Sequence, residues 1–196
     1  MKKLTKNFIN TGLFVGVSGI FIILFLSGRQ QTWTADSKVA PPLTVRWTVV
    51  KVSDGDTITV RQTANEKVKV RLACIDAPET SKKGQAGQEW GEESTKNLQK
   101  LVNEANNEVM VSIVDTDRYG RKVAEVFTSV NGGEKSLNEE QLTSGNAYLY
   151  RQYLKNCPNA EVFQRAEEIA AAKRIGVWSG NYEKPWDFRK RIKNQQ

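Results

Sequence analysis

Acidic residues and an arginine gather between Val50 and Thr80 in a combination that suits phosphodiester chemistry. Ca²⁺ prefers carboxylate, carbonyl and water oxygens, and Asp56 and Asp76 are candidate ligands from two separate segments. Arg71 can clamp charged phosphate oxygens, and Glu79 can accept the proton of an attacking water. With a cation as Lewis acid, these groups are sufficient to hydrolyse a phosphodiester.

These residues lie where predicted strands end. Hydrophobic and β-branched residues recur with period two on both sides of the SDGD sequence, which predicts strands joined by turns rather than a helix. Strand ends are a common place for catalytic groups, because the sheet supports the loops rigidly. The alternative interpretation is that SDGD and DAPE are ordinary turns whose acids are only solvated.

Composition narrows the possible chemistry. The chain has 196 residues and a formal net charge of +7, which suits one compact domain with an appendage and a polyanionic partner or surface. It contains no histidine. This excludes Ser-His-Asp and Cys-His hydrolysis, His-ligated metal nucleases and phosphohistidine chemistry. Catalysis by this chain must therefore use carboxylates, arginines, tyrosines and a metal.

Residues 1–28 are expected to lie outside the folded domain. Lysines precede an uncharged apolar run from Phe8 to Ser27, which at ~20 residues is long enough to cross a membrane. An uncleaved anchor and a cleaved export signal both remain open, and either one places the rest of the chain outside the cytoplasm. Residues 29–42 contain a Pro-Pro pair among polar and small residues and predict a linker.

The domain itself is predicted over residues 43–181. Strands are predicted at 44–52, 57–62, 67–74 and 108–114, with one more after residue 121. Helices are predicted at 89–105, 136–144 and 161–173, and Ser136 is the expected N-cap of the second. Residues 81–91 predict a mobile loop beside the acids, and residues 182–196 a basic extension with a frayed end.

Further candidates for contact with phosphate and base lie later in the chain. The turn sequence DRYGR carries Tyr119 and Arg121, and Arg121 could face Arg71 across a pocket and stabilise charge on phosphorus. Tyr148 and Tyr150 belong to an aromatic cluster that could stack on bases. The alternatives are that Arg121 is an exposed solubilising residue and that the tyrosines pack in the core.

The ordered segments DGDT, RLACIDAPET, DRYGR and AYLY, followed by a helix that ends in GVWSG, resemble the staphylococcal nuclease (thermonuclease) family. The resemblance extends from Val50 to about Gly180. It implies an α+β fold dominated by an OB-type five-stranded barrel with three helices. It also implies a Ca²⁺-dependent phosphodiesterase that acts on DNA and RNA, and we expect a monomer.

The resemblance also assigns roles to single residues. Asp56, Asp76 and the backbone carbonyl of Ala77 resemble the family's metal ligands. The best-known member has threonine in place of Ala77, and this change should preserve a carbonyl ligand while losing a hydroxyl. The expected catalytic residues are Arg71, Glu79 as general base, and Arg121. The residues expected to contact substrate are Tyr119, Tyr148 and Tyr150.

Two features complete the comparison with that family. The PWDFR sequence near the C-terminus resembles an extension carried by some bacterial members. Cys74 and Cys157 form an even pair in a domain expected outside the cytoplasm, which favours a disulfide. Two buried free thiols are the alternative.

A nuclease that uses metal-assisted attack of water is the leading interpretation. The alternative is a non-catalytic nucleic-acid-binding module at the cell surface, which would need no metal. Such a module should have lost some of the catalytic set, whereas this chain retains Asp56, Arg71, Asp76, Glu79 and Arg121. Replacing either arginine by alanine is predicted to lower turnover by roughly 10²- to 10³-fold while the fold persists.

Overall fold

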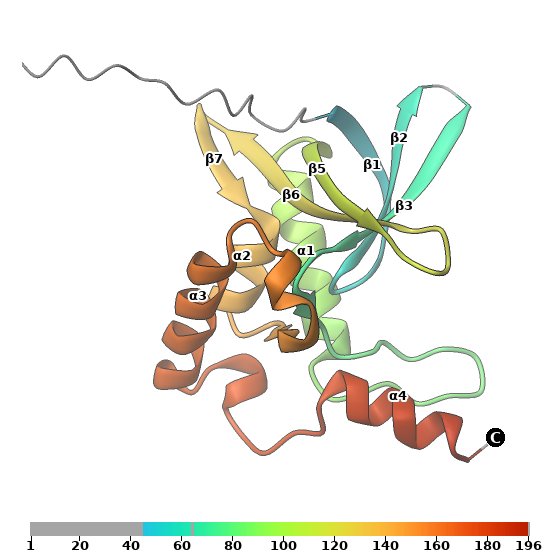
Figure 1. Ribbon diagram of the computed structural model, residues 1–196, viewed down its shortest axis with the longest axis vertical. Coiled ribbons are helices and arrows are strands. Elements are labelled where there is room, and N and C mark those ends of the chain that lie inside the picture. Colours follow the sequence, from blue (N-terminus) through green and yellow to red (C-terminus); the bar gives the residue numbers. More distant parts are fainter. Residues whose placement is uncertain (1–44, 64, 196) are drawn as a thin grey trace, which may run out of the picture. The chain divides into compact units, whose positions relative to one another are not determined.

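A computed structural model describes residues 45–63 and 65–195, and a closed five-stranded barrel forms its centre (Figure 1). The barrel strands are β1 (Val45–Asp54), β2 (Thr57–Thr63), β3 (Glu66–Leu72), β5 (Glu108–Thr116) and β6 (Lys122–Val130). They are ordered β3-β2-β1-β5-β6, and parallel pairing of β3 with β6 closes the barrel. A hairpin adds β7 (Gly133–Ser136) to β6. The expected five-stranded barrel is confirmed.

The strand register gathers the candidate site residues at one end of this barrel. Thr57, directly after Asp56, pairs with Arg71 across β2 and β3. The short strand β4 (Ile75–Asp76) follows β3 and pairs with β8 (Tyr148–Leu149), which places Asp76 opposite Tyr148. The turn that carries Asp56 requires glycine at position 55, because a Cβ there would lie 1.8 Å from Ser94 Oγ.

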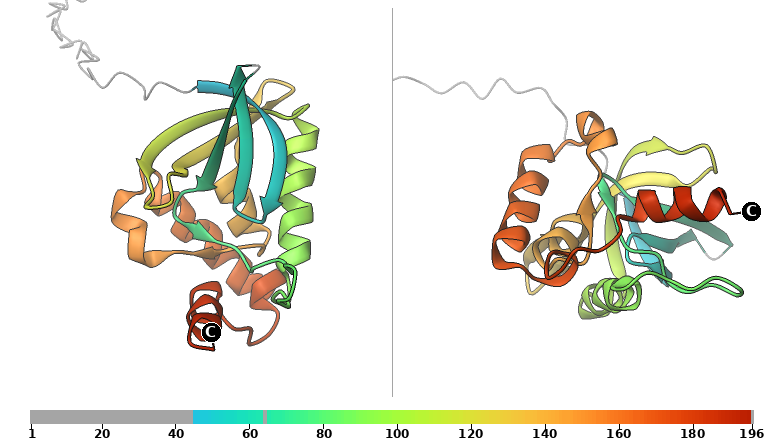
Figure 2. Two further views of the ribbon diagram at one scale, coloured as in Figure 1. Left: turned by 90° about the vertical axis from the view of Figure 1, so that its right-hand side faces the viewer. Right: turned by 90° about the horizontal axis from the view of Figure 1, so that it is seen from below.

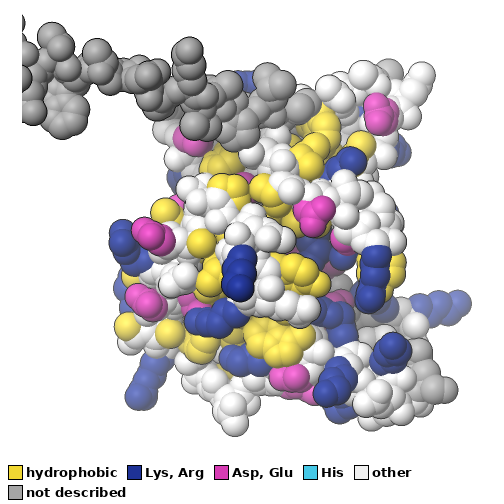
Figure 3. All heavy atoms as spheres, in the orientation of Figure 1, with side chains coloured by type: hydrophobic (Ala, Val, Ile, Leu, Met, Phe, Trp, Pro, Cys, Tyr) yellow, Lys and Arg dark blue, Asp and Glu magenta, His cyan; other side chains and the backbone are white. Residues whose placement is uncertain are grey.

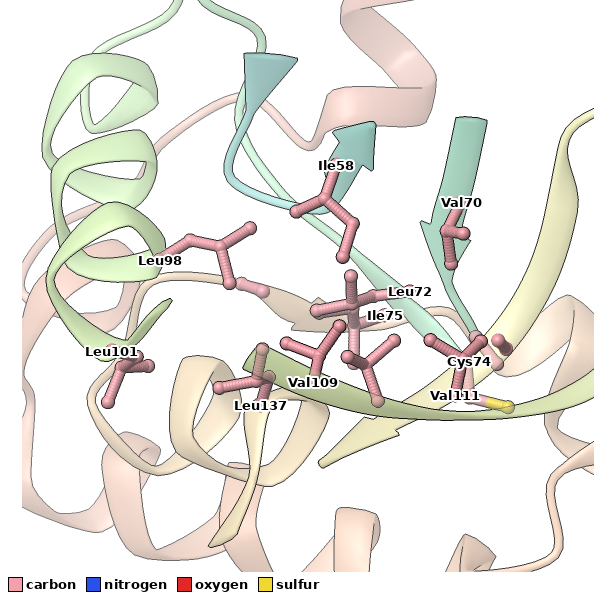
Figure 4. Packing of buried hydrophobic residues seen from close by; sticks show 14 of the residues in the cluster. Ile58, Val70, Leu72, Cys74, Ile75, Leu98, Leu101, Val109, Val111 and Leu137 are labelled. Carbon is pink, nitrogen blue, oxygen red and sulfur yellow. The ribbon is translucent and has the colours of Figure 1, made fainter. Parts of the chain in front are cut away.

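Helices cover the barrel and supply part of its core. The three predicted helices correspond to α1 (Gly91–Glu104), α2 (Leu137–Thr143) and α3 (Ala160–Lys173). Leu98 and Leu101 of α1 point toward the barrel side chains Ile58 and Val109 (Figure 4). Each aliphatic side chain buried in this way contributes about 1.5–3 kcal/mol. Ser136 caps α2 as predicted, since its hydroxyl accepts a hydrogen bond from the Glu139 N–H at 3.3 Å.

The C-terminal extension forms a fourth α-helix, α4 (Pro185–Lys193), where a frayed tail was expected. Proline at the first helical position is favourable, because the N–H that it lacks would have no partner within the helix. Pro185 and Phe188 are buried and hold the helix against the domain. Two views place α4 at the end of the barrel beside the loop of residues 80–90 (Figure 2).

A disulfide joins Cys74, just before β4, to Cys157, with the Cα atoms 6.1 Å apart. The expected pairing is therefore formed. Cys157 directly follows the 3₁₀ helix η1 (Arg151–Asn156), and a second 3₁₀ helix, η2 (Gly176–Trp178), follows α3.

The predicted anchor or signal (residues 1–28) and the linker (residues 29–42) lie outside the described residues. Within the part of the chain that the structure describes, no helix combines the length and the apolar character needed to cross a membrane.

Candidate active site

Arg71 joins the two carboxylates that the sequence suggests as metal ligands. Its Nη1 contacts Oδ1 of Asp56, and its Nη2 donates to Oδ1 of Asp76 at 2.6 Å. Both carboxylates therefore lie within hydrogen-bond reach of one planar guanidinium. The carboxylates from the β1–β2 turn and from β4 therefore converge, as the sequence predicted.

These charged groups are shielded from solvent. The side chains of Asp76, Asp56 and Arg71 are 0%, 6% and 15% exposed. Burial raises the pKa of Asp56, but the charge of Arg71 and a 2.8 Å hydrogen bond from the Ala77 N–H outweigh it. The pKa of Asp56 thus lies below its ordinary value, and the group is ionised at neutral pH.

A third acid, Asp54, lies on the same turn. Its Oδ1 accepts a hydrogen bond from the backbone N–H of Asp56 at 3.2 Å. Burial raises the pKa of Asp54 to about 7, and the neighbouring charge on Asp56 adds to the effect. At neutral pH Asp54 is therefore about half protonated, whereas Asp56 stays ionised.

Glu79 reaches the same cluster through a residue that the sequence analysis missed. Arg189 of α4 donates from Nη1 to Asp76 Oδ1 at 3.1 Å and to Glu79 Oε1 at 3.0 Å, and from Nη2 to Asp76 Oδ2 at 2.7 Å. Lys82 Nζ also lies 2.9 Å from Glu79 Oε2. One guanidinium therefore spans Asp76 and Glu79. The available signal was the PWDFR sequence near the C-terminus, whose last residue is Arg189.

The backbone of Glu79 is fixed at the base of the loop that was expected to be mobile. Its N–H donates to Gln88 Oε1 at 3.0 Å, and its carbonyl accepts from the Gln88 N–H at 2.8 Å. Gly91 packs against the same carbonyl, since a Cβ at that position would lie 2.3 Å from the Glu79 oxygen. These contacts hold the candidate general base in position.

Arg121 binds an aspartate of its own turn. Its Nε donates to Asp117 Oδ2 at 2.7 Å, and its guanidinium carbon lies 5.8 Å from the centroid of the Tyr119 ring. The next residue, Lys122, pairs with Val70 in β3, so the turn begins beside the strand of Arg71. Tyr119 is 70% exposed. Arg121 and Tyr119 thus form a solvent-facing pair next to the cluster, and Arg189 supplies the second guanidinium on the acids.

The two remaining candidates for substrate contact are covered. Tyr148 is buried, its hydroxyl donates to the Val177 carbonyl at 3.0 Å, and Lys184 Nζ lies 3.7 Å from its ring centroid. The Tyr150 ring stacks on Trp186 with centroids 5.6 Å apart and planes inclined by 2°. The segment that begins α4 therefore contacts the rings of both tyrosines.

The described residues can offer a cation only a small set of ligands. They contain no group of three or more Asp, Glu, Cys or His side chains arranged to hold a metal ion. The converging oxygens of Asp56 and Asp76 form a hard donor pair, which suits Ca²⁺ or Mg²⁺ when carbonyl and water oxygens complete the shell. The residues therefore fit a hard divalent cation and provide nothing for a soft one.

The chain is similar in sequence to a known protein family and to several known proteins. The model of the family described as staphylococcal nuclease homologue matches residues 69–180. An uncharacterized endonuclease of Haemophilus influenzae is 39% identical over 133 residues, which cover 68% of this chain and 66% of that protein. Endonuclease YncB of Bacillus subtilis is 33% identical over 152 residues, with 77% and 69% covered.

The matched share of other relatives varies widely. Protein ParB of Escherichia coli is 32% identical over 158 residues, which cover 78% of this chain and 83% of that protein. The region matched in a 38.1 kDa protein of Capnoides sempervirens covers only 33% of that protein. The chain thus spans between a third and most of the length of these relatives.

Proposed function

The chain belongs to the staphylococcal nuclease family, and from this membership we propose that it is a nuclease that hydrolyses DNA and RNA with the help of Ca²⁺. The proposal rests on one observation. The carboxylates of Asp56 and Asp76 converge on Arg71 at one end of the barrel, and Arg189 links Asp76 to Glu79. Such a cluster suits phosphodiester hydrolysis in a chain without histidine.

In this proposal Asp56, Asp76 and the carbonyl of Ala77 hold the cation. When bound, Ca²⁺ would act as a Lewis acid on the phosphate oxygens. The oxygen-only ligand set supports a hard cation. The role of Ala77 rests on its backbone, so the methyl side chain does not weaken it.

The remaining chemistry is assigned to side chains of the same cluster. Arg71 binds a non-bridging phosphate oxygen and stabilises the charge that develops on it. Glu79 accepts the proton of the attacking water, and the contacts of its backbone with Gln88 keep it in place. Arg121 exchanges Asp117 for the phosphate, which its partly exposed position permits, and Tyr119 lies beside it to contact the same substrate.

A digestion experiment tests the proposal. The purified full chain is expected to cleave plasmid DNA and RNA with Ca²⁺ and to leave both intact with a chelator. Asp76→Asn should abolish this cleavage, because it removes a ligand charge, whereas Asp115→Asn should behave like the parent, because Asp115 is an exposed β5 residue. Nucleic acid that stays intact in Ca²⁺ would instead support a non-catalytic binding module.

We also propose that the domain works outside the cytoplasm, either anchored through residues 1–28 or released after their removal. The Cys74–Cys157 disulfide supports this location, because such bonds persist in oxidising compartments. Sequencing the N-terminus of the protein from cell surfaces and from medium would separate the two forms. Recovery of reduced protein from the cytoplasm alone would refute the proposal.

A further inference from the structure

The segment from Lys184 to Arg189 lies on the residues that the proposed reaction needs. We propose that this segment is an intramolecular occupant of the active site, in which Arg189 takes the place of the divalent cation and Trp186 the place of a nucleobase. The docked helix α4 would then keep the enzyme inactive until metal and nucleic acid displace it. This inference rests on the proposed function for what is displaced, but its structural basis is independent of catalysis.

Arg189 occupies the carboxylate of Asp76, which the proposed function assigns to the cation. Its side chain is fully buried, and both of its oxygens accept hydrogen bonds from Arg189, at 3.1 Å and 2.7 Å. Oδ1 also accepts from Arg71. A cation bound by Asp76 would share these oxygens with a second positive charge a few ångströms away, and like charges at such distances repel strongly in a buried site. Docking of Arg189 and binding of a divalent cation therefore oppose each other.

Trp186 and Lys184 cover the rings of Tyr150 and Tyr148. The Trp186 and Tyr150 rings are parallel within 2°, which is how a nucleobase stacks on an aromatic side chain. The Lys184 ammonium lies over the Tyr148 ring and, at 4.5 Å, near the centroid of Trp178. A pocket of about 270 Å³ opens beside this stack, lined by Leu149, Tyr150, Arg151, Gln152 and Trp186. Trp186 therefore covers a surface on which a base could otherwise stack.

Helix α4 could be released from the site by metal and nucleic acid. The docked helix is held by a short set of contacts: the Arg189 ion pairs, the Trp186 stack, the buried Pro185 and Phe188, and a bond from Gln88 Nε2 to the Glu183 carbonyl at 2.7 Å. Its last turn carries Lys190, Arg191 and Lys193, which would be attracted to a polyanion. A cation that neutralises Asp76 and a nucleic acid that binds these basic residues would both favour undocking.

The fraction of molecules with α4 docked determines how far the apparent affinity for the cation is reduced. If α4 is docked in about 90% of molecules, the apparent affinity for the cation is reduced about tenfold. Arg189→Gln removes the competing charge, so the apparent affinity for the cation should rise about tenfold. Arg191→Gln is the matched control, because it removes the same charge from the same helix and leaves Asp76 and Glu79 untouched: Arg191 pairs with Glu183 and lies 5.1 Å from the centroid of the Phe188 ring.

The experiment measures Ca²⁺ binding by calorimetry and hydrogen exchange of the α4 amides in the full chain. We expect Arg189→Gln to bind Ca²⁺ about tenfold more tightly than the parent and Arg191→Gln to match the parent. In the parent, saturating Ca²⁺ with a single-stranded oligonucleotide should accelerate exchange in residues 185–193.

Two results would overturn the inference. Unchanged α4 exchange in the liganded parent would show that the helix stays docked. Equal or weaker Ca²⁺ binding by Arg189→Gln would show that Arg189 supports the site rather than competing for it. Cleavage is scored separately: if neither the parent nor Arg189→Gln cuts nucleic acid in Ca²⁺, the proposed function fails, while exchange and calorimetry still decide the role of α4.

Discussion

Arg71 is paired with two buried carboxylates, and this pairing sets the cost of removing it. Arg71→Ala leaves Asp56 without its guanidinium partner, and breaking a buried pair in this way typically costs about 3–5 kcal/mol. Turnover should fall roughly 10²- to 10³-fold as well. Urea unfolding and steady-state kinetics on the same preparation measure both. The fold of this variant is still expected to persist, but with lower stability, and an unchanged unfolding midpoint would contradict the expected loss.

Removing Arg121, unlike removing Arg71, should lower turnover without lowering stability. Its pair with Asp117 is partly exposed, with side chains 29% and 19% accessible, and pairs of this kind contribute about 0–1 kcal/mol. Arg121→Ala should therefore unfold like the parent while losing roughly 10²- to 10³-fold in turnover. Arg46→Ala is the control, because Arg46 also belongs to an exposed ion pair, with Glu108 on the barrel. Turnover within a few-fold of the parent would remove Arg121 from the mechanism.

The residue types of the site were predictable, but their partners were only partly so. Asp56, Arg71, Asp76 and Glu79 lie on consecutive strands and turns, so their convergence follows from local pattern. Arg189 is 113 residues from Asp76 in sequence, and no local pattern links the two. The pairing of Arg121 with Asp117 inside a five-residue turn was also missed, because Arg121 was expected to face either the substrate or solvent.

Among the elements, the start of α1 determines where Glu79 lies. A Cβ on Gly91 would approach the Glu79 carbonyl oxygen to 2.3 Å, and both atoms belong to backbone that cannot swing aside. Gly91→Ala should displace the Glu79 segment and lower turnover at least tenfold, since small misplacements of catalytic groups are costly. Gly133→Ala is a suitable control, because the nearest atom to its Cβ would be 3.5 Å away. Equal kinetics for the two variants would show that the Glu79 carbonyl is free to move.

The disulfide ties β4 to the end of η1 across a separation of 83 residues. Loop-closure entropy predicts about 4–5 kcal/mol of stabilisation for a bond that closes a loop of this length. The double variant Cys74→Ala/Cys157→Ala should therefore unfold at a lower urea concentration than the parent. The parent should move to the same midpoint when reductant is added, whereas the double variant should not respond. If reductant also shifts the unfolding midpoint of the double variant, the shift does not come from loss of the Cys74–Cys157 disulfide.

Element prediction succeeded where periodicity was strong. The barrel strands were found from period-two patterns, α1 and α3 from their helical apolar patterns, and α2 from the capping box that begins at Ser136. The strands β4 and β8 are two residues each and depend on pairing with each other, which a local pattern cannot show. Helix α4 was missed because its apolar residues are few among lysines and arginines, and its helical state depends on burial of Pro185 and Phe188 against the domain.

At the scale of the whole molecule, the positive charge should govern how nucleic acid binds. The chain carries 29 basic and 22 acidic residues, and Lys and Arg side chains gather around α4 on the face shown in Figure 3. Binding of a single strand releases about 0.7 counterions for each phosphate contacted. If four or five phosphates are contacted, the slope of log affinity against log salt should be about −3.

That slope can be measured without cleavage, by fluorescence anisotropy of a labelled oligonucleotide in the presence of chelator. Lys82→Gln/Lys83→Gln should reduce its magnitude by about 0.7 for each lysine that meets a phosphate, because fewer counterions are released. Lys51→Gln/Lys69→Gln is the charge-matched control, on exposed positions of the barrel strands. If both double variants flatten the slope equally, binding follows net charge alone, and the loop between Glu79 and Gly91 has no particular part in holding the strand.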